Sequence, residues 1–237
     1  MKKMENTEMK ERILKYLKEH SHDNKRKIID IAKGIGMSDT PDAIVNPLLE
    51  MEKDYEVIRN GFGYYFDRES AGVIEGKISI NKAGLGFIDR EDQDSIRIRD
   101  NNQMTAMSGD IVLVQCQPWE TYGKVIAILK RARTHVIGTF EDSGRGLHLV
   151  LDDEKIQQRI KRVRYEDDFT PISGMKVLCD IEDYGIPLIL RVREVIGYKD
   201  DPGVDITSIL LDHDIEPEFS DEVMEQAHSI PQTVPQK

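Results

Sequence analysis

The sequence predicts an α+β chain of several domains, in which a small helical domain precedes two β-barrels. Apolar residues recur at spacings of three and four over the first fifty positions, which is the helical period. From residue 72 to residue 195, short β-branched runs alternate with Gly, Asp and Asn, a pattern typical of small barrels. This β-rich part also repeats itself, and the 237 residues provide enough chain for the whole arrangement.

The N-terminal part is predicted to form a winged helix-turn-helix, because three short helices precede a hairpin. The helices are expected over residues 8–20, 25–34 and 41–53. Thr7 is the expected cap of the first helix. Pro47 lies inside the third helix and predicts a kink or an early break there.

The hairpin is predicted over residues 55–66, where the turn signal Asn60-Gly61 separates two β-prone runs. The alternative is a small helical cap with a hairpin at its edge. The third helix carries three carboxylates, and Lys53 is its only cation. This helix is therefore poorly equipped to read a DNA major groove, where cations neutralise the phosphates.

Two five-stranded barrels are predicted in tandem because the β-rich part contains an internal repeat. Gly76 matches Gly138 at an interval of 62 residues, and Gly109 matches Gly174 at an interval of 65. After the second barrel, a turn and a short helix begin an acidic linker. The expected domains are therefore the winged helix at 1–70, the barrels at 72–133 and 134–197, and the linker at 198–237.

Phe87 and Arg97 are the leading binding candidates in the first barrel. They lie in adjacent predicted strands, where residues two apart share a face. Nucleobases stack on flat side chains while cations neutralise phosphates, which holds a single strand with little sequence preference. The cations expected to contact phosphates are Lys77, Lys82, Arg90 and Arg99. The alternative is that Phe87 belongs to the barrel core and that the cations are ordinary surface residues.

The second barrel offers His148, Arg159 and Lys161 as binding candidates. His148 can stack on a base, although a lone histidine on a strand is more often a plain surface residue. Arg159 and Lys161 alternate to one side of the chain, and Arg162 and Arg164 to the other. A strand with cations on both faces is expected at a sheet edge or in a loop.

The formal net charge of −11 does not exclude a nucleic-acid partner, because most of the acidity is local. Residues 198–237 carry −8, while residues 1–72, 73–135 and 136–197 carry −1, +1 and −3. Cys116 and Cys179 lie in apolar runs without metal or redox spacing, so we expect buried thiols in a reducing compartment. No membrane-spanning run or signal core is present, and a soluble cytoplasmic protein is expected.

The search for catalytic motifs finds no GxxxxGK[ST], GxGxxG or GxSxG pattern in a suitable context. Asp152, Asp153 and Glu154 could suggest a metal site, but no other element supplies further ligands. Asp201 and Asp205 lie in a turn that leads into the predicted helix, which explains them without an ion. We therefore expect no catalytic residue, metal site or cofactor on this chain.

The order of a winged helix and two cold-shock-like, OB-type barrels resembles the ribonuclease R group of the ribonuclease II family. The segments that carry this resemblance are 104–114, 194–197, 201–206 and 215–223. It covers nearly the whole chain and is least specific in the winged helix. The chain departs from the family at Leu85 and Arg97, where two aromatic residues are replaced and one cation is gained.

The resemblance implies a processive 3′→5′ exoribonuclease whose Mg²⁺-dependent aspartate cluster lies in a domain after the barrels. No residue of this chain matches that cluster, so the family implies an RNA-binding, non-catalytic part that guides RNA. Single-stranded or structured RNA and a catalytic ribonuclease domain are the expected partners, and no membrane is expected. The alternative function is a winged-helix regulator whose barrels bind a ligand or a partner, and a protein-interaction scaffold is a third possibility.

Overall fold

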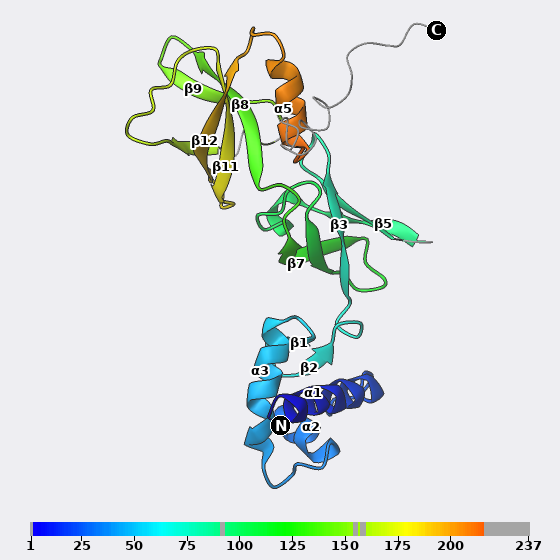
Figure 1. Ribbon diagram of the computed structural model, residues 1–237. Helices are drawn as coiled ribbons and strands as arrows, with labels where there is room; N and C mark the ends of the chain where they lie inside the picture. The colour runs from blue at the N-terminus through cyan, green and yellow to red at the C-terminus, as the bar shows by residue number, and fades with distance from the viewer. Residues whose placement is uncertain (1, 91–92, 154–155, 157–159, 216–237) are drawn as a thin grey trace, which may run out of the picture. The chain divides into compact units, whose positions relative to one another are not determined.

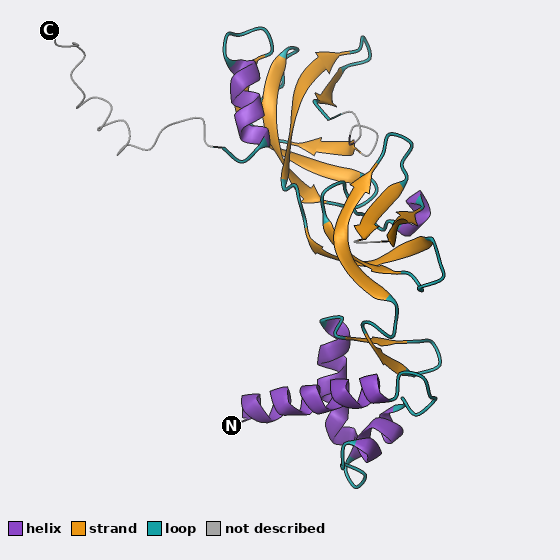
Figure 2. Cartoon of the chain, turned by 90° about the vertical axis from the view of Figure 1, so that its right-hand side faces the viewer, coloured by secondary structure: helices purple, strands orange, loops and turns teal. Residues whose placement is uncertain are grey.

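The computed structural model describes residues 2–90, 93–153, 156 and 160–215, and divides into two compact units. The first unit comprises Met1–Ala132 and the second Arg133–Lys237. Helices gather in the N-terminal part of the first unit, and strands are the main regular elements in the rest of the described chain (Figures 1 and 2). The fold is therefore α+β, as the sequence predicts.

The N-terminal part consists of helices followed by a two-stranded hairpin. The helices are α1 (Lys2–Glu19), α2 (Ile28–Gly34), the 3₁₀ helix η1 (Pro41–Ile44) and α3 (Val45–Lys53). Strands β1 (Val57–Arg59) and β2 (Tyr65–Asp67) pair antiparallel across the predicted turn. Buried apolar side chains from every helix and both strands form one core, which includes Ile13, Leu17, Ile31, Ile44, Leu48, Met51, Val57 and Tyr65.

Two predicted details of these helices are wrong. The first helix begins at Lys2, so Thr7 lies in its interior and does not cap its start. The third helical stretch changes from the 3₁₀ helix η1 to α3 between Ile44 and Val45 and not at Pro47. Pro47 is the third residue of α3. A proline is tolerated in the first turn of a helix, where the backbone N–H has no intrahelical acceptor.

A closed five-stranded barrel completes the first unit. Its strands are β3 (Val73–Ile80), β4 (Gly86–Arg90), β5 (Gln93–Ile98), β6 (Ile111–Gln115) and β7 (Tyr122–Lys130). They close in the order β3-β4-β5-β7-β6, with β5 and β7 parallel and the other pairs antiparallel. The barrel is filled by apolar side chains that include Ile78, Ile88, Ile96, Ile98, Val112, Val114 and Val125.

The second unit contains a five-stranded sheet whose strands neighbour one another in the same cyclic order as those of the first barrel. Its strands are β8 (His135–Asp142), β9 (Leu147–Leu151), β10 (Ile160–Arg164), β11 (Met175–Asp183) and β12 (Leu188–Tyr198). The sheet order is β10-β12-β11-β8-β9, so its two edge strands are not paired with each other over the residues that the structure describes. The second domain is thus barrel-like, but the predicted closure is seen only in the first.

The internal repeat predicted from the glycines is confirmed by equivalent backbone contacts. Gly109 has φ +98° and donates its N–H to the Ile78 carbonyl at 2.7 Å. Gly174 has φ +86° and donates to the Phe140 carbonyl at 2.8 Å. Ile78 and Phe140 are 62 residues apart, and Gly109 and Gly174 are 65 residues apart. These are the two intervals of the predicted repeat. Only glycine adopts such backbone angles without strain, which explains why it marks both units.

The C-terminal helix α5 (Val204–Asp212) is anchored on the second sheet through few contacts. Val204 and Ser208 are buried, and His135 Nε2 donates to the Leu211 carbonyl at 2.8 Å. Ile206 and Ile209 are each 61% exposed. No helix among the described residues has both the length and the apolarity to cross a membrane.

Both cysteines are buried and unbonded, as predicted. Burial raises the pKa of the Cys179 thiol to about 12 and also raises the pKa of the Cys116 thiol. A thiol in this state is protonated at neutral pH and reacts slowly. Both side chains therefore belong to the packing of the two sheets.

Asp110, the residue immediately before β6, is a buried carboxylate that holds neighbouring segments of the first barrel together. Its side chain is buried and accepts hydrogen bonds from the Met107 and Ala132 backbone N–H groups at 2.9 and 2.8 Å. The Arg131 guanidinium donates to the same carboxylate at 2.9 Å. One carboxylate therefore connects the segments before β6 and after β7.

Asp110→Ala is expected to lower the free energy of unfolding of the first barrel by about 3–5 kcal/mol, because it leaves Arg131 and two buried donors without their acceptor. Urea unfolding measures this loss. The matched control is Asp89→Ala, since Asp89 is an exposed carboxylate on the same barrel. Equal stability of the Asp110 variant and the control would contradict the anchoring role.

Candidate functional site

A single row of side chains crosses four strands on the outer face of the first barrel. Ser79 on β3 pairs with Phe87 on β4, and Phe87 pairs with Arg97 on β5. Arg97 in turn pairs with Tyr122 on β7. We name Ser79, Phe87, Arg97 and Tyr122 the outer row. The row faces away from the core because the residues before and after it on β3, β4 and β5 point inward.

The outer row presents two aromatic rings with a cation between them. Arg97 is exposed, Phe87 is partly buried, and Tyr122 is 41% exposed. The Arg99 guanidinium lies over the Tyr122 ring, 4.6 Å from its centroid, which is a cation–π contact. Phe87 and Arg97 therefore share one outer face, as predicted, and Phe87 does not belong to the barrel core.

The predicted phosphate-contacting cations occupy different positions around this face. Lys77 is exposed on β3, and Lys82 is exposed in the turn between β3 and β4. Arg99 is already stacked on Tyr122. Arg90 donates from Nε and Nη2 to the Asp94 carbonyl at 2.9 and 2.6 Å, so its guanidinium is engaged in closing the β4–β5 hairpin.

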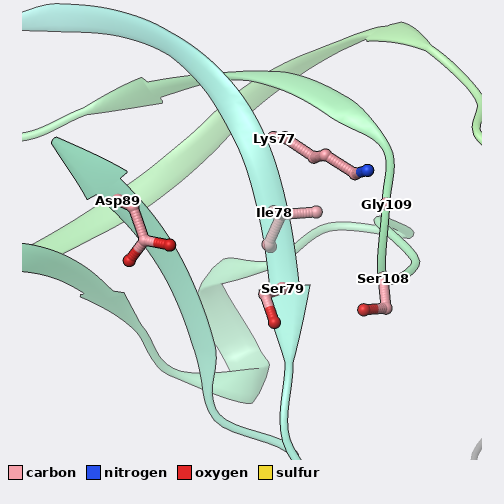
Figure 3. Close-up of a pocket in the computed structure, with 6 residues that line it drawn as sticks. All are labelled: Lys77, Ile78, Ser79, Asp89, Ser108 and Gly109. Carbon is pink, nitrogen blue, oxygen red and sulfur yellow. The ribbon is translucent and has the colours of Figure 1, made fainter.

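A polar pocket of about 410 Å³ adjoins the outer row at Ser79. Its lining residues are Lys77, Ile78, Ser79, Asp89, Ser108 and Gly109. Figure 3 shows three of them on β3, with Asp89 on the neighbouring strand and the Ser108 side chain directed toward β3. Asp89 accepts a hydrogen bond from Ser95 Oγ at 2.8 Å. The ammonium group and the two hydroxyls can donate hydrogen bonds to the oxygens of a sugar-phosphate chain.

His148 occupies the position in the second domain that corresponds to Phe87 in the first. It pairs with Glu141 between β8 and β9, just as Phe87 pairs with Ser79 between β3 and β4. The His148 side chain is exposed. Lys161 lies on β10, which is an edge strand as predicted, but its side chain and the whole of Arg159 fall outside the described residues.

Most cations described on the second sheet are paired with carboxylates, although Arg162 on β10 is exposed and no carboxylate contacts it among the described residues. Arg164 contacts Glu182 at 3.0 Å, Arg191 contacts Glu166 at 3.0 Å and also Glu182, and Arg193 contacts Asp180. The hydrogen bond from Arg191 is the main cause that holds the pKa of the Glu182 carboxyl below its usual range. The charges on this face therefore largely compensate one another.

Three of the carboxylates considered as metal ligands are engaged elsewhere, and Glu154 lies outside the described residues. Asp152 pairs with Lys176 at 2.9 Å, and Asp153 pairs with Arg133 at 3.4 Å. Asp201 accepts a hydrogen bond from the Tyr198 N–H at 3.1 Å in the turn before α5. Within the described part of the chain, no three His, Cys, Asp or Glu side chains come together in a way that could hold a metal ion.

Two aromatic residues were not predicted from the sequence, namely Trp119 in the β6–β7 connection and Tyr122 at the start of β7. Trp119 is 80% exposed, and Tyr122 completes the outer row. The signal available in the sequence is the cluster of two aromatic residues ahead of Gly123, at the start of the last strand of the barrel. The proximity of Tyr122 to Arg97 depends on the parallel pairing of β5 with β7, which local patterns do not reveal.

Two family models match the β-rich part of the chain. Residues 76–125 match the Ribonuclease B OB domain, and residues 148–220 match the Cold shock domain. Both β-sheet domains are therefore of the OB type, in the class of small barrels that includes cold-shock domains.

Curated relatives of this chain are ribonuclease R proteins. That of Thermotoga maritima is 29% identical over 197 residues, which cover 79% of this chain and 28% of that protein. That of Acidithiobacillus ferrooxidans is 25% identical over 84% of this chain and 47% of that protein. The chain thus spans less than half of the length of these relatives. The two domain matches and these relatives show that the chain is related to ribonuclease R through its OB domains.

Solved structures of Mycoplasma genitalium RNase R resemble this chain in fold. The apo form is 25% identical with a TM-score of 0.51, and covers 68% of this chain and 27% of its own. The same protein in complex with ribose methylated single-stranded RNA is 26% identical with a TM-score of 0.50, at the same coverage.

Phe87→Ala is expected to lower the free energy of unfolding by less than the ~3–5 kcal/mol typical of truncating a buried phenylalanine, because the ring lies on the outer face. Urea unfolding of the full chain provides the measurement, and Ile88→Ala is the matched control because Ile88 is the buried neighbour on the same strand. A loss for Phe87→Ala as large as that for the control would place the ring in the core.

Proposed function

We propose that this chain binds single-stranded RNA along the outer row of its first OB domain, as the RNA-guiding, non-catalytic part of a ribonuclease R-like 3′→5′ exoribonuclease. The observation that carries the proposal is the register Ser79–Phe87–Arg97–Tyr122, which aligns aromatic rings and a cation across adjacent strands. The relationship to ribonuclease R, including a relative in complex with single-stranded RNA, supports it.

The chemistry of the outer row suits a single strand better than a duplex. Unpaired bases expose their flat faces, and each base that stacks on an aromatic ring contributes ~1–3 kcal/mol. Arg97 can stack on a base or pair with a phosphate. Lys77 and Lys82 lie exposed around the row and are assigned to the phosphates. In a duplex the bases are stacked on one another, and their faces are not available to this surface.

The second domain is assigned a smaller share of the binding. His148, at the position equivalent to Phe87, is its proposed stacking residue, and Arg159 and Lys161 are its proposed phosphate contacts. The paired charges of Arg164, Arg191 and Arg193 on the described part of this sheet leave little net attraction for phosphates. Most of the affinity is therefore expected from the first domain.

The remaining parts of the chain receive supporting roles in this proposal. The helices and hairpin of residues 1–70 are assigned as a winged helix, whose α3 carries too few cations to read a major groove. Residues 198–237 are assigned as an acidic linker toward a catalytic ribonuclease domain, in which the Mg²⁺ centre would lie. A cytoplasmic location is part of the same proposal.

Phe87→Ala is expected to weaken the binding of a single-stranded RNA oligonucleotide by about 1–3 kcal/mol, because one stacking platform is lost. Arg97→Ala is expected to weaken binding as well. If Arg97 pairs with a phosphate, its loss should reduce the slope of log K against log salt by about 0.7, and by less if it stacks. Fluorescence anisotropy at several salt concentrations measures both effects.

The matched control is Arg164→Ala, because Arg164 is an exposed cation whose charge is compensated by Glu182 in the second domain. Its affinity and salt slope should equal those of the parent chain. Unchanged binding in both first-domain variants, or a preference for one duplex DNA sequence over single-stranded RNA, would contradict the proposal and favour a transcription regulator.

RNA binding is expected to persist after removal of divalent ions with EDTA at matched ionic strength, because stacking and cationic side chains need no metal. Labelled RNA incubated with the chain and Mg²⁺ is expected to remain intact, as judged on a denaturing gel. Cleavage that disappears in Asp201→Ala or Asp205→Ala variants would overturn the non-catalytic assignment.

A further inference from the structure

We infer that Trp119 is an additional nucleobase-stacking residue, which extends the outer row through the turn between β6 and β7. The inference rests on the proposed function, because it assigns a further contact to the same single strand. It adds a position that neither the strand pattern nor the pairing of the outer row contains. The geometry of the turn, the exposure of the indole and the neighbouring contacts each support it.

The turn that carries Trp119 is held by its own hydrogen bonds. The Glu120 N–H donates to the Gln117 carbonyl at 2.9 Å, and the Gln117 N–H donates to Glu120 Oε2 at 3.0 Å. Pro118 occupies the second position of this four-residue turn, where its restricted φ is favourable. The Cys116 thiol donates a hydrogen bond to the Glu120 carbonyl at 3.4 Å. The position of Trp119 is therefore set before any ligand arrives.

The same turn leads directly into the outer row. The Arg97 N–H donates to the Thr121 carbonyl at 2.9 Å, and the next residue, Tyr122, pairs with Arg97. Trp119 is three residues from Tyr122, which places their backbones at most about 10 Å apart. A nucleic-acid strand that crosses the sheet from Phe87 to Tyr122 would thus meet the indole as it leaves the barrel.

The exposure of Trp119 has no packing explanation. Its side chain is 80% exposed, although tryptophan offers the largest apolar surface of any residue. Single exposed apolar residues are common on proteins, but Trp119 is only three residues along the chain from Tyr122, a second exposed aromatic residue, on whose ring Arg99 is stacked. The carboxylate of Glu120 lies in the same turn and disfavours a phosphate there. The indole is therefore assigned to a base rather than to the backbone.

Trp119 is the only tryptophan in the chain, so its fluorescence reports directly on this site. The full chain is titrated with a single-stranded oligouridine of eight nucleotides while anisotropy of a labelled oligonucleotide records binding. Stacking on the indole is expected to change the tryptophan emission in proportion to the occupied fraction. Binding without any change in emission would overturn the inference.

Two substitutions separate stacking from general apolar contact. Trp119→Leu is expected to weaken binding between about 5-fold and about 150-fold, the range for the loss of one stacked base. Trp119→Phe retains an aromatic face and should recover part of this loss. Circular dichroism and urea unfolding should be unchanged in both variants, because the indole is exposed. Equal affinities of Trp119→Leu and the parent chain would overturn the inference.

Phe62→Leu is the matched control, because Phe62 is an aromatic residue of similar exposure, 82%, in the turn of the N-terminal hairpin. Its affinity should equal that of the parent chain. If Phe62→Leu lowers the RNA affinity as much as Trp119→Leu does, the location of Trp119 beside the outer row does not matter for binding. That result would contradict the inference. If Phe87→Ala weakens binding and Trp119→Leu does not, the inference fails while the proposed function stands. If neither variant weakens binding, both fail.

Discussion

The register of the closed first barrel is the constraint on which the candidate site depends. Because side chains alternate along a strand, burying Ile78, Ile88 and Ile96 inside the barrel forces the intervening residues outward. The pairing of β3, β4, β5 and β7 then aligns these outward residues in one row. A slip of one residue in any strand would exchange the two faces and would cost both the core and the site.

The two OB domains use one scaffold with different surface chemistry. Equivalent glycines, Gly109 and Gly174, make the same backbone contact in each domain, so the local geometry is conserved within the chain. The first domain carries aromatic rings and exposed cations on its outer face, whereas most of the described cations of the second sheet pair with carboxylates. The proposed binding of a nucleic acid by a chain with net charge −11 rests on this difference, because it confines the attraction to one restricted surface.

Much of the fold and half of the site followed from local patterns. The repeat of glycines and the shared face of Phe87 and Arg97 could be predicted, since both depend on spacing within or between adjacent strands. Tyr122 could not, because it reaches Arg97 only through barrel closure, a non-local pairing of β5 with β7. The hydrogen bond from Arg90 to the Asp94 carbonyl could not be predicted either. It crosses the β4–β5 hairpin next to an irregularity in the strand register between Ile88 and Arg90.

Photocrosslinking tests directly whether the outer face of the first OB domain binds RNA. The full chain is irradiated with a single-stranded oligonucleotide that contains 4-thiouridine, and the crosslinked peptides are identified by mass spectrometry. Crosslinks are expected at residues 85–90 and 117–124, and they should be lost when unlabelled RNA competes. Crosslinks confined to residues 1–70 or to the second domain, with none in the first barrel, would contradict it.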